Sequence, residues 1–279
     1  MRDHRSRPID VRALRKRFKQ SVLGRLADRF FELRPIERGL ALGSKLFTAV
    51  VPAAIIVSGL LSAPHALSNR LVEGLGLTGS GAAAVQQLFQ VPQGTAGATI
   101  NIVGVLVLLY SLVSFARALQ RLYEDAWHLP PTRTGIAWGL VWLVAFSAYF
   151  SLSSPVARLL HAHGYTVGAF LVSLIGGAVL WSVTPAILLG RRVPLRALRR
   201  GGLTTAVLLT LFNVGTHVYV PHSMTTNVSR YGLVGVTFTI LSWLFAFSLV
   251  LVASAAAGAV FGGGQAAAAT NHVPNDPLT

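Results

Sequence analysis

The sequence predicts an all-α, polytopic membrane protein with six transmembrane helices and both chain ends in the cytoplasm. Three observations favour this fold class: the composition, the length of the apolar blocks, and the distribution of Lys and Arg. Hydrophobic residues make up 53% of the 279 residues and charged residues only 12%, and the mean hydropathy is +0.59. An ordinary soluble domain carries about a quarter charged residues. This chain therefore has too little polar sequence to cover a water-facing surface.

Six apolar blocks are long enough to cross a bilayer, which takes about 20 mostly apolar residues for roughly 30 Å of hydrocarbon. None of the six contains Asp or Glu. We predict one transmembrane domain over residues 40–261. Its expected spans are residues 40–61, 98–116, 136–154, 166–190, 203–220 and 232–257.

Lys and Arg are unevenly distributed among the segments between these blocks. Segments 1–39, 117–135 and 191–202 carry 20 of the 24 basic residues, and the intervening loops carry three. The remaining one, Lys45, lies inside the first block. Because cytoplasmic loops are enriched in Lys and Arg, the basic side is predicted to be cytoplasmic. The net charge of +15 then lies on one membrane face, and no nucleic-acid partner is expected.

The segment before the first span, residues 1–39, predicts a basic amphipathic helix. Apolar residues recur at steps of three and four, and Arg and Lys fill much of the remaining surface. Pro8 suits the first turn of such a helix and Pro35 its end. We expect it to lie along the cytoplasmic leaflet, bound to anionic phospholipid head groups. The apolar positions are Val11, Leu14, Phe18, Val22, Leu26, Phe30 and Leu33.

Two further segments lie outside the spans. The long loop over residues 62–97 shows weak helical patterning on either side of a run of glycines, so we expect two short amphipathic helices on the outer face. The tail, residues 262–279, is polar and of low complexity. It is predicted to be a disordered cytoplasmic tail.

Polar residues inside or beside the spans are the candidate functional residues. Lys45 lies about one turn inside the first span, where it either extends to the head groups or faces an anionic ligand. Asn213 and His217 are four residues apart on one face of the fifth span. They are expected to make interhelical hydrogen bonds, and a proton relay through His217 is the alternative.

A cluster of charge ends the second span, in the stretch from Ser114 to Trp127. Arg117, Arg121 and Glu124 lie on one helical face, and Asp125 is four residues beyond Arg121. Two interpretations are open: an ion-paired extension of the helix at the cytoplasmic interface, or a gate or binding site at the cytoplasmic mouth.

The loop before the fifth span adds two further candidates. Arg191 and Arg192 open this basic loop, which contains no acidic residue.

The sequence does not predict an enzyme. There is no cysteine, so thiolate metal sites and iron–sulfur clusters are excluded. The spans hold no paired carboxylates for two-metal chemistry, no Gly-rich phosphate loop and no nucleophile elbow. We therefore expect no catalytic, cofactor-binding or metal-binding residues.

Four stretches together resemble the YihY/BrkB family of bacterial inner-membrane proteins, once labelled ribonuclease BN. LGSKLFTAVVPAAI (42–55) resembles its opening helix with a central proline, and YSLVSFARALQRLYEDAW (110–127) the end of its second helix. RRVPLRALRRGGLTTAVL (191–208) is similar to its cytoplasmic loop, and YGLVGVTFTILSWLFAFSLVLVASA (231–255) to its last helix. The family's last helix often ends near an acidic residue, and ASAAAG (253–258) has none.

The resemblance implies a multi-pass protein of the bacterial inner (plasma) membrane with a role in envelope integrity. With the basic cytoplasmic face, it favours a non-catalytic protein that moves or organises lipids or another amphipathic substrate. The alternative is an ion-coupled small-molecule transporter, which needs a titrating group deep in the membrane. A membrane-associated nuclease is the third and least favoured hypothesis, because the spans contain no paired carboxylates for a two-metal site.

Overall fold

The computed structural model is helical throughout the part of the chain that it describes. That part comprises residues 21–60, 68–69, 72–73, 75–88, 97–131, 139–149, 156, 159, 164–190 and 192–263. The helices are α2 (Val22–Glu32), α3 (Pro35–Leu60), α5 (Gly79–Leu88), α6 (Gly97–Ala126), α8 (Thr166–Leu188) and α9 (Leu195–Gly262), with a further helical segment at Gly139–Tyr149. No strand occurs among these residues. The predicted all-α class is confirmed.

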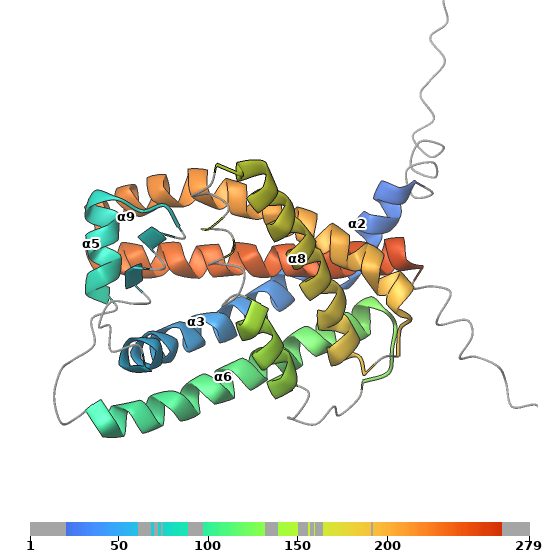
Figure 1. The fold of residues 1–279 in the computed structure, drawn as a ribbon, viewed down its shortest axis with the longest axis horizontal. Helices are drawn as coiled ribbons and strands as arrows, with labels where there is room; N and C mark the ends of the chain where they lie inside the picture. The colour runs from blue at the N-terminus through green and yellow to red at the C-terminus, as the bar shows by residue number, and fades with distance from the viewer. Residues whose placement is uncertain are drawn as a thin grey trace, which may run out of the picture.

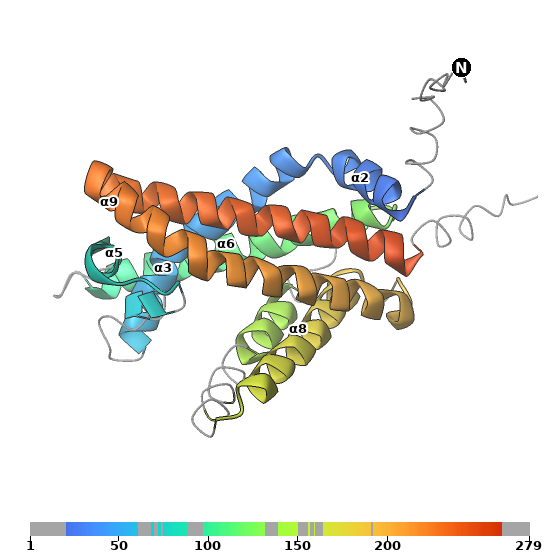
Figure 2. The same cartoon turned by 90° about the horizontal axis from the view of Figure 1, so that it is seen from above.

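Helix α9 is a hairpin of two antiparallel legs that lie side by side (Figures 1 and 2). The chain reverses at Gly232, whose φ of 57° and ψ of −137° suit a residue without a Cβ. Trp243 Nε1 donates to Thr216 Oγ1 at 3.1 Å, and Asn227 Nδ2 donates to Thr239 Oγ1 at 2.9 Å. These bonds join the two legs across their shared face.

The predicted loop over residues 221–231 is helical. Pro221 lies within the first leg of α9, and the hydroxyl group of Thr225 donates to the Pro221 carbonyl at 2.9 Å. Thr226 bonds back to His222 in the same way. Threonine hydroxyl groups that donate to a carbonyl oxygen four residues earlier are compatible with a helix. The chain therefore stays helical through this segment and reverses at Gly232.

The helices form a bundle with two hydrophobic clusters, one toward each end. Helix α3 packs on α6 and on α9, and α8 packs on the first leg of α9. The first cluster includes Leu42, Leu119, Leu122 and Trp127 and lies where α2, α6 and the ends of α9 meet. The second joins α5 to the α9 turn. Figure 1 shows α2 and α5 at opposite ends of the long axis.

Helix α2 is the described part of the predicted amphipathic helix, and it packs on the end of α9. Leu26 and Phe30, on its predicted apolar face, pack against the first cluster, whereas the sequence predicted that this face would lie in the cytoplasmic leaflet. Arg29, predicted on the basic face, is buried against the end of α6. The helical path is interrupted between α2 and α3 at Arg34, whose φ is 50°, and α3 begins at Pro35. Proline suits this first helical position because it needs no hydrogen-bonded N–H.

Within the described part of the chain, two helices are long and apolar enough to cross a membrane, Ile102–Ala126 in α6 and Arg196–Gly262 in α9. The core helix of a soluble protein passes the same test, but a core helix is mostly buried. Only 22% of the apolar window of α6 is buried, whereas 56% of that of α9 is buried, so the test separates α6 alone from a core helix. Large apolar side chains of α6, α8 and α9 are exposed, among them Ile102, Val167 and Val218. This exposed apolar surface indicates association with a membrane.

Glycine permits the closest approach between α8 and α9. A Cβ on Gly202 would lie 2.7 Å from the Ser182 backbone nitrogen and 2.8 Å from the Ala178 carbonyl oxygen, and would also overlap the Ser182 hydroxyl. Small residues at such crossings are how helices pack in apolar solvent. Gly215 on the same leg of α9 meets nothing within 4 Å.

We therefore expect Gly202→Ala to lower the free energy of unfolding by about 1–3 kcal/mol, because the methyl group forces two backbones apart. Gly215→Ala is the matched control and should raise stability by about 0.5–1 kcal/mol, since it removes a mid-helix glycine. Thermal unfolding of the purified protein in detergent measures both. Equal effects of the two substitutions on stability would contradict the close contact of α8 with α9 at Gly202.

Candidate functional site

A basic groove of about 330 Å³ lies between α3 and α6, at the end of the molecule where α2 packs. We call it the α3–α6 groove. It contains four cationic side chains, a serine, and small or apolar residues. The lining residues are Arg38, Ala41, Leu42 and Lys45 from α3, and Ser114, Arg117, Ala118, Arg121 and Leu122 from α6.

Helical spacing explains why these residues share one groove. The α3 contributors recur at steps of three and four, as do those of α6, so each set occupies one face. The two faces meet because α3 packs along α6. Leu42 and Leu122 are almost fully buried and form the floor. Arg117 and Arg121 are exposed at the rim.

One hydrogen bond joins the two walls. Lys45 Nζ donates to Ser114 Oγ at 2.8 Å, and both residues are partly buried. The sequence left two orientations of Lys45 open, one toward the head groups and one toward an anionic ligand. In the structure its side chain lines the groove. At the mouth, the Arg38 guanidinium pairs with the Asp125 carboxylate.

Glu124 forms a separate, buried interaction with Arg192. Its side chain is 2% exposed, and Oε1 accepts from Arg192 Nη2 at 2.7 Å and from Gln120 Nε2 at 3.0 Å. Arg192 also donates to the carbonyl oxygens of Leu189 at 3.0 Å and Pro130 at 2.8 Å. This network joins the connection between α8 and α9 to the end of α6.

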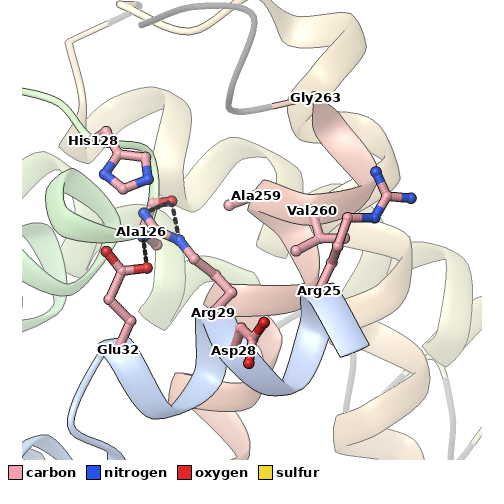
Figure 3. Close-up of a pocket in the computed structure, with 9 residues that line it drawn as sticks. All are labelled: Arg25, Asp28, Arg29, Glu32, Ala126, His128, Ala259, Val260 and Gly263. Atoms are coloured by element: carbon pink, nitrogen blue, oxygen red, sulfur yellow. Dashed lines mark hydrogen bonds and ion pairs between the residues drawn. The ribbon is translucent and has the colours of Figure 1, made fainter. Parts of the chain in front are cut away.

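A second, smaller pocket of about 230 Å³ lies where α2 meets the ends of α6 and α9 (Figure 3). Arg29 projects from α2 into it and donates from Nε to the Ala126 carbonyl oxygen at 3.2 Å. It also pairs with Glu32 at 2.6 Å. A cation at the last carbonyls of a helix satisfies them and complements the helix dipole. Arg29 is thus the carboxyl-terminal cap of α6.

The structure brings together three of the residues that the sequence singles out. Lys45, Arg117 and Arg121 line the α3–α6 groove. Glu124, predicted on the same face as the two arginines, turns instead into the buried network with Arg192. Asp125 pairs with Arg38 of another helix. Each acid forms its ion pair with an arginine from another part of the chain and not with Arg117 or Arg121.

The other predicted residues lie elsewhere. Asn213 and His217 are exposed on the first leg of α9, and neither hydrogen-bonds to another described residue. The expected interhelical bonds are therefore not found in the described part of the chain. The His217 Nδ1 atom lies beside Gly76, near α5, and so outside the groove. Arg191 lies outside the described residues.

The sequence does not indicate Arg38 and Ser114 as groove residues or Arg29 as a cap. Arg38 is one of 12 basic residues before the first span, and nothing local distinguishes it. Ser114 is 69 residues from its partner Lys45. Only the packing of α3 on α6 relates the two, so no spacing rule finds them.

The described residues hold no group of three or more His, Cys, Asp or Glu that could bind a metal ion. The chemistry that the groove offers is donation of charged and neutral hydrogen bonds to an anion. No protein-family model, curated protein or solved structure matches the chain. The family resemblance stays a prediction based on its motifs.

We expect Arg192→Gln to destabilise the protein by about 3–5 kcal/mol, because it removes the guanidinium group that pairs with the buried Glu124 carboxylate. Adding Glu124→Gln should recover much of that loss, since it removes the buried charge. Arg34→Gln is the matched control. It breaks the pair with Glu37, in which both side chains are about 70% exposed, and should cost under about 1 kcal/mol. Chemical unfolding in detergent measures all three.

Proposed function

We propose that this chain is a multi-pass protein of the bacterial inner membrane that moves or organises lipids or another amphipathic substrate without catalysis. One observation carries the proposal. The α3–α6 groove has a cationic rim and an apolar floor, and it opens beside the exposed apolar surface of α6. A ligand with an anionic head and an apolar body suits such a surface.

The proposal includes six spans with both ends in the cytoplasm. Helices α3, α6 and α8, the segment Gly139–Tyr149 and the two legs of α9 correspond to the six apolar blocks. The segments predicted to be cytoplasmic meet at one end of the molecule: α2, the end of α6, the start of α9 and its last turn (Figure 1). This common end supports the orientation derived from Lys and Arg.

The depth of the groove also favours a head group as its occupant. Arg38, Arg117 and Arg121 lie near the basic end, while α6 continues as an apolar helix on the other side of Ser114. In a bilayer, that boundary corresponds to the head-group level of the cytoplasmic leaflet. Resemblance to the YihY/BrkB family would add envelope integrity as the physiological role.

Single cysteines test the topology cleanly, because the natural chain has none. Ser80 in α5 and Arg199 in the first turns of α9 are both exposed. Helix α5 and the start of α9 lie at opposite ends of the molecule (Figure 1). In right-side-out membrane vesicles, Ser80→Cys should react with an impermeant maleimide, and Arg199→Cys only after permeabilisation. The cysteine-free parent provides the blank. Labelling of both positions from the same side would contradict the proposed topology.

Reconstitution tests the activity. Purified protein in liposomes should accelerate the exchange of a fluorescent anionic lipid between leaflets, compared with protein-free liposomes. Lys45→Ala with Arg117→Ala should slow that exchange, because the two substitutions remove half of the groove's cations. An unchanged exchange rate with well-folded parent protein would remove lipid movement from the proposal.

A further inference from the structure

We infer that the α3–α6 groove binds the phosphate group of an anionic lipid, whose apolar chains lie along α6, and that Asp125 competes with this phosphate for Arg38. The inference rests on the proposed function and names the ligand chemistry of its site. Three features of the groove support it: unbalanced charge, the set of donors, and an apolar stripe that continues the groove.

The first feature is the charge of the groove. Four cationic side chains line about 330 Å³, and the lining includes no acid. Among the described residues, Asp125 alone pairs with one of these cations, Arg38. Lys45 bonds to a neutral hydroxyl group. Like charges this close repel one another in a partly buried site, so an added anion stabilises the arrangement.

The second feature is the number and type of donors. Arg117 and Arg121 follow one another by one helical turn, and each guanidinium presents a planar fork that matches phosphate oxygens. Ser114 accepts a hydrogen bond from Lys45, so its own O–H is available to donate. A phosphate offers more acceptor oxygens than a carboxylate does. The set of ammonium, hydroxyl and guanidinium donors therefore favours phosphate.

The third feature is an apolar stripe on the same face of α6. Val103, Leu106 and Tyr110 precede Ser114 at steps of three and four, so they continue the line of groove residues. These side chains are 56%, 62% and 76% exposed. From Ser114 to Val103 the helix rises about 16 Å, a length suited to acyl chains. A free anion would make no use of this stripe, whereas a lipid covers it.

Asp125 limits the affinity of this site. Its carboxylate holds Arg38 at the mouth of the groove, and the same arginine lines the groove. Asp125 is itself fixed, because Arg29 of α2 donates to its backbone carbonyl at 2.5 Å. To bind Arg38, a lipid phosphate must share this arginine with the Asp125 carboxylate or displace that carboxylate from it. Removing that carboxylate therefore strengthens binding.

Thermal unfolding of the full chain in a neutral detergent tests the inference, with phosphatidylglycerol, phosphatidylcholine or inorganic phosphate as the added probe. A ligand that binds the folded state raises the Tm with its concentration. We expect phosphatidylglycerol to raise the Tm, and phosphatidylcholine and inorganic phosphate to leave it unchanged. Lys45→Gln and Arg121→Gln should each raise the half-maximal lipid concentration about fivefold. Asp125→Asn should lower it.

Arg199→Gln is the matched control, because it removes an exposed arginine that does not line the groove. It should leave the half-maximal concentration unchanged. An equal effect of Arg199→Gln and Arg121→Gln, or an equal shift with phosphatidylcholine, would overturn the inference. A full shift with inorganic phosphate would also overturn it, and would assign the groove to free phosphate. Since Arg121 is exposed, its variant keeps the test valid if Lys45→Gln fails to fold.

Failure of this inference is distinguishable from failure of the proposed function. Leaflet exchange that persists without a lipid-dependent Tm shift would overturn the phosphate site and leave lipid movement standing. A groove-dependent Tm shift without leaflet exchange would support the site and remove lipid movement.

Discussion

Arginines from three separate parts of the chain hold the carboxyl-terminal end of α6. Arg29 of α2 caps its last carbonyl groups, Arg38 of α3 pairs with Asp125, and Arg192 after α8 pairs with the buried Glu124. A buried carboxylate or carbonyl group without a partner costs several kcal/mol. These contacts therefore determine how α2, α3 and the start of α9 meet α6. The walls of the α3–α6 groove are positioned by the same contacts.

The arginines at this end divide into two kinds by what they contact. Arg29 and Arg192 are turned toward the protein and bond to its backbone and carboxylates. Arg117 and Arg121 stay exposed at the rim of the groove. The first kind stabilises the bundle, and the second is free to meet an anion. A count of basic residues cannot separate them, because the distinction depends on which helix lies opposite.

The predicted spans anticipate the described helices, with differences at their ends. The second block stops at residue 116, whereas α6 continues to Ala126 because its polar last turns are bonded to other segments. The fifth and sixth blocks are legs of one hairpin, with the reversal at Gly232 and not over 221–231. Hydropathy finds the part of a helix that suits an apolar solvent. It does not find polar turns that tertiary contacts or capping bonds stabilise.

The helical class, the apolar blocks and the clustering of basic residues between them could be predicted from the sequence, because each depends only on local composition and period. The sequence also indicated Lys45, Arg117 and Arg121 as candidates, since a charge beside an apolar span is visible without a structure. The packing of the helices places these three in one groove with Arg38 and Ser114 and pairs Glu124 with Arg192. This could not be predicted because the contacting residues of α3 and α6, Lys45 and Ser114, are 69 residues apart in the chain. No local pattern encodes which faces of two distant helices pack together.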